Sequence, residues 1–372
     1  MNPVSALRAG ARRTAFTITE MLAVIAIVVV LIVIAVPSFQ AMIKSSEEAM
    51  AESMLATALK AGRDVAFRAG AGNDAAIVFF FEPGGRCTAV PCVRAGVVRD
   101  VDSGGDPVDR EIFVPAPEFS PIAMPKHWLV RGWVGPNSLA AAGEYYHGGG
   151  GPYRYEIGSA GNWVFPETGF FNRESLDDGL QRSTFMVRFA GGTGALVSAP
   201  PTAVLVLSPR GTRVTSAGAP SAAESEFDPN DQKWAGDPVG LVRAVLRGKL
   251  PNSTAPISLT DKQTILGRLS SNMVMARPVA AIALYSEQQL AVALGVRIDR
   301  TTDSIYRPWS AGQQEPTFVD SSIDPQRINR WMEGNTNNTN DQNGLDGGDV
   351  PLAKLFSIDR YSGALRRLEV QP

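Results

Sequence analysis

The chain has 372 residues, of which 44% are hydrophobic and 19% are charged, as expected for a folded protein and not for a disordered one. Its formal net charge is −2, so no overall positive field attracts nucleic acid, which is not expected as a partner. The 36 glycines and 26 prolines favour short strands and many turns over a helical bundle.

The N-terminal region joins a basic leader to a long apolar run. The first 19 residues contain three arginines and no acid, and residues 21–36 are sixteen apolar residues without a break. Extended back to Phe16 and on to Phe39, the segment reaches the roughly 20 residues that cross a bilayer as a helix. We therefore predict a transmembrane helix over about 17–39, with the arginine-rich leader in the cytoplasm and the rest of the chain outside.

A secretory signal peptide and a plain signal anchor also begin with basic and then apolar residues. Glu20 argues against both, because a carboxylate at the edge of an apolar run is costly in a membrane and usually marks function. The residues after Val36 are Pro37, Ser38 and Phe39, which do not form a small-x-small cleavage site. The sequence therefore favours a segment with a role beyond export or anchoring.

The stretch RRTA-FTITEMLAVIAIVVVLIVIAVPSF resembles the processing signal of type IV prepilins and type II secretion pseudopilins. In that family a basic leader ends in a small residue, usually glycine, and is followed by Phe, Thr, two mostly apolar residues and Glu before a long apolar helix. Here Ala15 takes the small position, Phe16 is the first mature residue, Glu20 is fifth from it, and Pro37 matches a common helix-kinking proline. Ala15 in place of glycine and the polar Thr19 depart from the pattern.

The resemblance implies that a membrane-embedded prepilin peptidase cleaves between Ala15 and Phe16 and N-methylates the new amine of Phe16. A free α-amino group has a pKa near about 8 and is positive at neutral pH. Buried among apolar helices, Glu20 needs a partner or a proton, and the Phe16 amine of a neighbouring subunit can supply one. Such a pair would set the axial register between subunits, as polar groups do in coiled coils.

The family also implies partners and a location. The partners are the prepilin peptidase, other pilins or pseudopilins bound through the N-terminal helix, and an assembly platform in the inner membrane. The chain is then a single-pass protein of the inner (cytoplasmic) membrane, with its C-terminal head in the periplasm or outside the cell. After processing it is incorporated into a fibre.

The predicted fold class is α+β: a long N-terminal helix, transmembrane in its first half, packed on an antiparallel β-sheet head. Residues 1–15 form the leader, 16–69 the helix and 70–372 the β-rich head. Beyond Pro37 the helix has one apolar stripe, which suits a helix laid against a sheet, and Gly70 and Gly72 are natural stops.

Strand patterns follow the helix. AAIVFFFE (75–82), TFMVRFA (184–190) and AVLVLS (203–208) read as strands, and LFSIDR (355–360) with LRRLEV (365–370) reads as a final hairpin. The helix, the first strand and this ending are similar to H-type minor pseudopilins and FimT-type minor pilins. Because such proteins are usually shorter, we expect an inserted mixed region over 221–335.

Two groups of residues are candidate stabilising sites. Cys87 and Cys92 close a short loop in RCTAVPC, and in an exported domain they are predicted to form a disulfide, with two free thiols as the alternative. A late polar loop supplies closely spaced oxygen ligands of the kind that calcium favours. Calcium is thus a candidate ligand and a solvated turn the alternative; the candidate ligands are Asp341, Asn343, Asp346 and Asp349.

The sequence predicts no catalytic site, and the chain is not expected to be an enzyme or to need a cofactor. HGGGG (147–151) lacks the serine elbow of an esterase, and DSGGDP (102–107) precedes both histidines, contrary to the serine-protease order. The aromatic residues that follow His127 form either packed core or a partner surface. The predicted function is a pilin-like structural subunit; the alternatives are an adhesion, DNA-binding or substrate-binding minor pilin and, last, an anchored enzyme.

Overall fold

The computed structural model describes the twelve segments 18–82, 86–101, 107–133, 163–165, 168–172, 180–197, 204–207, 273–301, 303–306, 327–328, 331–332 and 352–368. The chain divides into two compact units, Met1–Ala49 and Met50–Pro372. The predicted cleavage residues Ala15 and Phe16 lie outside the described residues, as do all four candidate calcium ligands.

Helix α1 runs from Ile18 to Ala69. It ends where the sequence predicts, because Gly70 and Gly72 adopt φ values of 77° and 83°, a left-handed backbone that side chains disfavour. Pro37 lies inside α1, and the kink predicted there stays a prediction.

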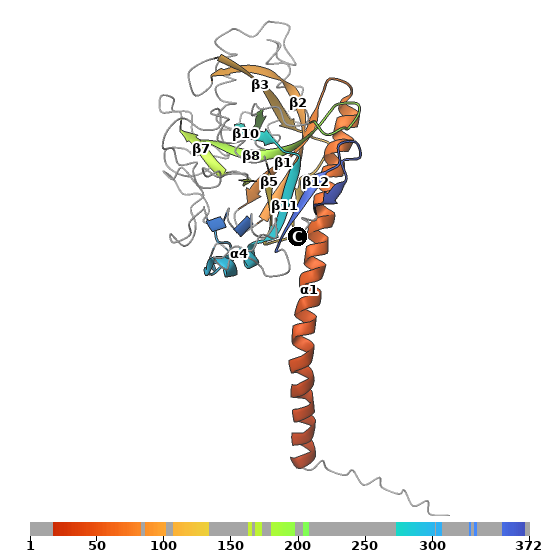
Figure 1. Ribbon diagram of the computed structural model, residues 1–372, viewed down its shortest axis with the longest axis vertical. Helices are drawn as coiled ribbons and strands as arrows, with labels where there is room; N and C mark the ends of the chain where they lie inside the picture. The colour runs from red at the N-terminus through yellow and green to blue at the C-terminus, as the bar shows by residue number, and fades with distance from the viewer. Residues whose placement is uncertain are drawn as a thin grey trace, which may run out of the picture. The chain divides into compact units, whose positions relative to one another are not determined.

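The larger of two sheets contains a closed ring of six strands (Figure 1). The ring strands are β1 (Ala75–Glu82), β2 (Arg86–Val101), β3 (Pro107–Pro115), β9 (Val204–Leu207), β10 (Met273–Pro278) and β8 (Leu180–Phe189). They pair in that order, and β8 pairs again with β1, which closes a β-barrel. Two of these pairings, β3 with β9 and β8 with β10, are parallel. Closure leaves the paired part of the ring without open edges.

Two short strands extend the ring: β4 (Ile122–Ala123) pairs with β2, and β7 (Thr168–Asn172) pairs with β8. The second sheet is antiparallel, in the order β13-β12-β11-β5-β6. Its strands are β5 (Trp128–Trp133), β6 (Trp163–Val164), β11 (Ala281–Ser286), β12 (Ala353–Ile358) and β13 (Leu365–Arg367). Strand β11 lies between β5 and β12 (Figure 1) and continues into helix α4 (Glu287–Leu294). The final hairpin predicted from the sequence is confirmed by the pairing of β12 with β13.

Two hydrophobic clusters lie on opposite faces of the barrel wall. One draws its members only from the six ring strands, so it fills the barrel interior; Val78 and Phe80 of β1 belong to it. The other gathers the alternate residues, such as Ile77 and Phe79, with the second sheet and with α1 from Ala51 onward. Phe79 stacks on Phe185 of β8 with ring centroids 4.8 Å apart. Strand β1 is therefore buried on both faces.

The predicted fold class was wrong. The structure is not a long helix packed on an antiparallel sheet: it has a closed six-stranded barrel with two parallel pairings, and a separate second sheet. The signal was present in AAIVFFF, because an unbroken apolar run without alternation is typical of a strand covered on both faces. One of the two strands that pair with β1 is β8, which lies about a hundred residues further along the chain. Local sequence patterns do not reveal such a distant pairing.

Part of the region predicted as an insertion belongs to the core of both sheets. Strand β10 is a wall of the barrel and β11 is the central strand of the second sheet. Ile328 and Trp331 are fully buried, and the ring of Trp331 meets Tyr285 of β11 edge-on at 5.8 Å. These described residues therefore form an integral part of the head. The rest of 221–335 lies outside the described segments.

The predicted disulfide between Cys87 and Cys92 is absent: both side chains are buried, and neither forms a disulfide. Both lie in β2, where Cys87 pairs with Phe81 and Cys92 with Ala76. Five steps along an extended strand separate their Cα atoms by about 16 Å, whereas a disulfide needs Cα atoms within about 7 Å. The odd spacing also sends the side chains to opposite faces, one to each hydrophobic cluster.

Both thiols are expected to be unreactive in the folded protein. Burial raises the pKa of the Cys92 thiol above its usual range, so almost no nucleophilic thiolate forms. A maleimide should label neither cysteine under native conditions and both after denaturation, and a reductant should not change the melting temperature. Mass spectrometry with and without denaturant gives the count; a reductant-sensitive melting temperature would mean that a disulfide exists.

Candidate functional site

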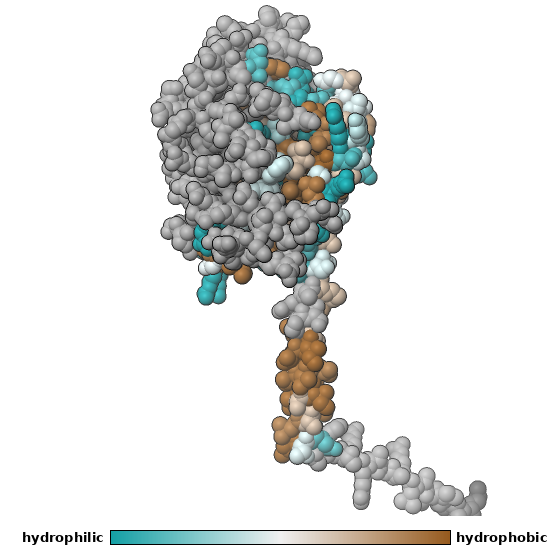
Figure 2. Space-filling view, in the orientation of Figure 1, coloured by the Kyte–Doolittle hydropathy of each residue, from teal (hydrophilic) through white to brown (hydrophobic). Residues whose placement is uncertain are grey.

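The first part of α1 is an apolar segment with its side chains exposed. Ile18–Val36, 19 residues with mean hydropathy 3.0, is the one helix among the described residues that is long and apolar enough to cross a membrane, and none of it is buried. Figure 2 shows brown, hydrophobic side chains over most of this stretch. Because water disfavours such a surface and lipid accepts it, the segment is consistent with a single-pass membrane anchor.

Glu20 lies in the first turn of this helix and is exposed. The first four N–H groups of a helix have no partner within the helix, and they favour a negative charge by about 0.3–1 kcal/mol. This stabilisation explains why an acid is favoured in the first turn of a helix. It is several times smaller than the cost of a charge within a membrane segment, so it does not by itself explain Glu20.

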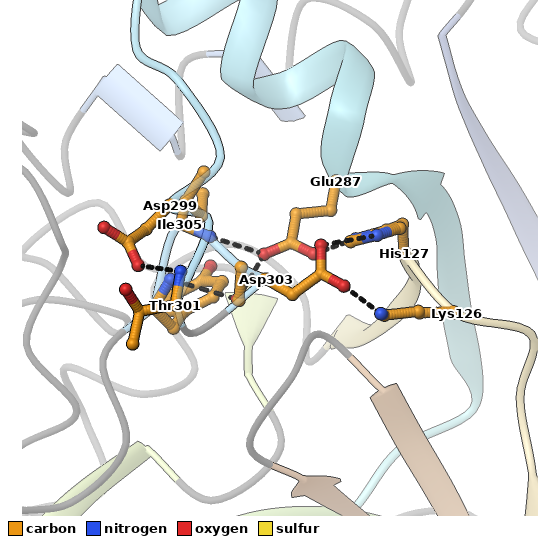
Figure 3. Close-up of polar contacts among 9 residues, drawn as sticks. Lys126, His127, Glu287, Asp299, Thr301, Asp303 and Ile305 are labelled. Carbon is orange, nitrogen blue, oxygen red and sulfur yellow. Dashed lines mark hydrogen bonds and ion pairs between the residues drawn. The ribbon is translucent and has the colours of Figure 1, made fainter.

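A polar cluster in the head joins three segments that are far apart in the sequence (Figure 3). His127 precedes β5, Glu287 is the first residue of α4, and Asp303 lies in the loop after α4. The Nδ1 atom of His127 lies 2.9 Å from Oε2 of Glu287, and its Nε2 atom lies 3.5 Å from Oδ1 of Asp303. The backbone N–H of Glu287 donates to the carbonyl oxygen of His127 at 2.8 Å.

Glu287 is fully buried and accepts further hydrogen bonds through its other oxygen. The Ser304 hydroxyl donates to Oε1 at 2.5 Å, and the Ile305 N–H donates to the same atom at 2.8 Å. The Tyr306 N–H donates to the Ser304 oxygen at 3.1 Å, which leaves the serine proton for the carboxylate. These contacts fix the loop against the start of α4.

Asp303 forms the outer side of this cluster. It forms an ion pair with Lys126, which is about half exposed, as Asp303 is. The hydrogen bond from Lys126 holds the pKa of Asp303 below its usual range, and the charges of Lys126 and His127 act in the same direction. Its φ of 52° is unusual for a residue other than glycine, and its N–H donates to the Asp299 carbonyl at 2.8 Å.

The chemistry of this cluster is positioning rather than nucleophilic catalysis. In a catalytic triad the serine hydroxyl faces the histidine, whereas here Ser304 donates to the carboxylate and is fully buried. Sequence analysis missed the cluster, because Glu287 is 160 positions from His127. Trp128 is one of the aromatic residues after His127 that were predicted to form either core or a partner surface. It is buried and so belongs to the core.

A second polar network lies where β8, β3 and the start of β1 meet. Arg188 donates from Nε to Oδ2 of Asp74 at 2.8 Å and from Nη2 to Oε1 of Glu111 at 3.0 Å. Burial lowers the pKa of Arg188, but the hydrogen bonds and charges of Glu111 and Asp74 outweigh burial and raise it. Asp74 also accepts the Gly191 N–H at 3.1 Å, and Arg94 forms a 2.6 Å ion pair with Glu111.

Among the described residues no group of three or more His, Cys, Asp or Glu side chains has the geometry of a metal site. Comparison of the chain with protein-family models, with curated proteins and with solved structures finds no match.

Proposed function

We propose that this chain is a pilin-like structural subunit that is processed by a prepilin peptidase and assembled into a type II secretion pseudopilus or a type IV pilus-like fibre. The observation that carries the proposal is the spacing of the N-terminal motif along the sequence. A basic leader, a small residue at 15, Phe16, Glu20 and an apolar run follow one another at the family's spacing. Each feature alone is common, but a signal peptide or plain anchor requires neither the phenylalanine nor the acid.

The shape of the segment supports the proposal. Its apolar residues form one helix with exposed side chains around it, which suits lipid before assembly and neighbouring helices after it. The subunit would lie in the inner membrane with its head outside the cytoplasm, and then move into a fibre through contacts of α1. The head would be displayed on the fibre surface, while α1 would make the contacts that hold the fibre together.

The test is N-terminal mass spectrometry of the chain extracted from membranes of cells that contain a prepilin peptidase. We expect a mature protein that begins with N-methylated Phe16. Ala15→Gly should be processed at least as fully, and Ala15→Leu should retain the leader. A wild-type chain that keeps Met1 beside an active peptidase, or one that begins near Ser38, would overturn the proposal.

A further inference from the structure

The two ring nitrogens of His127 both face carboxylate oxygens. Nδ1 faces Glu287 and Nε2 faces Asp303, at 2.9 and 3.5 Å (Figure 3). An ionised carboxylate only accepts hydrogen bonds, and a neutral imidazole has a single N–H to donate. A neutral ring can therefore satisfy one side only and turns a lone pair toward the other acid. The imidazolium form has an N–H for each side.

Both carboxylates are held in place by groups other than the histidine. Glu287 accepts hydrogen bonds from the Ser304 hydroxyl and the Ile305 N–H, which hold its side chain in place. Asp303 is paired with Lys126, which keeps it charged well below neutral pH. The carboxylates consequently remain as acceptors while the ring changes its proton count.

We propose that His127 is a proton-dependent clasp that fastens the loop residues 295–301 and 303–306 to α4 and to the start of β5. In the charged form it bridges Glu287 on α4 and Asp303 in the loop. In the neutral form the bridge to one of them is lost, and Lys126 alone holds the outer part of the loop. Histidine is the side chain that changes charge between about pH 5 and 8, so the clasp closes toward the acidic end of this range.

The charged ring has an N–H for each of the two carboxylates, whereas the neutral ring has an N–H for only one of them. The second contact is therefore present only while both ring nitrogens carry a proton. The N-terminus of α4 opposes a positive ring, whereas the Asp299 side chain accepts the Thr301 N–H, and Arg297 and Arg300 are exposed. The two carboxylates are the groups in contact with the ring.

Opening the clasp would affect the core through Tyr306, the last residue of the loop. Its ring stacks on Phe165 at 4.8 Å and meets Phe81 of the barrel at 5.2 Å. Its hydroxyl accepts a hydrogen bond from the buried Arg131 at 2.9 Å. The loop therefore connects the partly buried His127 to the packing between the barrel and the second sheet.

Amide hydrogen exchange of the full-length protein in detergent tests the clasp. After correction for intrinsic exchange rates, protection of the amides in the outer part of the loop, in particular that of Asp303, should fall about tenfold between pH 5.5 and pH 8, the loss expected for one charge-assisted hydrogen bond. Amides of β11 should not change. Equal loop protection at the two pH values would overturn the proposal.

His127→Asn is the matched variant, since asparagine tolerates the positive φ of 62° at this position and carries no charge at either pH. Its loop protection should be independent of pH, whereas Lys126→Gln should lower protection at both pH values and keep the pH dependence. A pH dependence in His127→Asn equal to that of the wild type would also overturn the proposal.

If His127→Asn does not fold, a His147→Gln background decides the question, because the chain then has one histidine. The titration midpoint of the single imidazole NMR signal must coincide with the midpoint of loop protection. Separate midpoints would show that another group controls the loop.

Discussion

Glu20→Gln is expected to leave the chain in the membrane but to reduce its incorporation into a fibre by at least about tenfold, because a charge pair between apolar helices is worth several kcal/mol when one partner is removed. The amide has nearly the size of the acid, so only the charge is lost. If Glu20 acted only on the helix end, the loss of about 0.3–1 kcal/mol would change assembly by no more than roughly fivefold. The measurement is the ratio of chain in sheared fibres to chain in membranes.

Glu47→Gln is the matched control for this variant. Glu47 is an exposed acid of the same helix but lies beyond the apolar segment, so its variant should assemble as the wild type does. Glu20→Asp keeps the charge on a shorter side chain and should retain part of the assembly. Equal fibre yields for Glu20→Gln and the wild type would exclude a register role, while mass spectrometry would still report on processing.

Arg188→Met is expected to destabilise the head by about 3 kcal/mol, because it leaves the carboxylates of Asp74 and Glu111 without their shared cation. Only 9% of the arginine side chain is exposed, against 19% and 25% for the two acids, so water compensates little. Arg94 and the Gly191 N–H keep the loss from being larger. At about 2–4 °C per kcal/mol, the melting temperature of the full-length protein should fall by roughly 6–12 °C.

Arg68→Met provides the comparison. Arg68 and Glu118 form an ion pair at 3.5 Å, but their side chains are 66% and 70% exposed, so the pair should contribute less than about 1 kcal/mol. Combining Arg188→Met with Asp74→Asn should recover part of the lost stability, because Asp74 then carries no unpaired charge while Glu111 keeps Arg94 as its partner. A melting temperature for Arg188→Met equal to that of Arg68→Met would contradict the assigned role.

Local pattern was enough to predict several elements of the fold. The apolar run and the two glycines after Ala69 predict α1 and its end, and the β-branched and aromatic run at 75–82 predicts β1 with the bounds observed. The final hairpin follows from two short strands around a Ser-Gly turn. These features depend on neighbours within a few residues, so the sequence states them directly.

The candidate sites also differ in whether they depend on neighbouring residues or on distant ones. The predicted processing signal is a local arrangement and stays a prediction, whereas the predicted disulfide is wrong because β2 continues through both cysteines where a loop was expected. Gly62 is a further case: in sequence it weakens a helix, but a Cβ at this position would lie 2.5 Å from Cγ1 of Ile77, so close packing against β1 requires glycine.

By itself, the sequence determined where the long helix ends and that residues near 75–82, 184–190 and 203–208 form strands, because side-chain periodicity is a property of neighbouring residues. Only the tertiary structure decided that β8 closes a barrel against β1 and that His127 meets Glu287. Strand patterns show which faces are apolar but not which distant strand covers them. That choice depends on the packing of the whole head against the entropy of closing long loops.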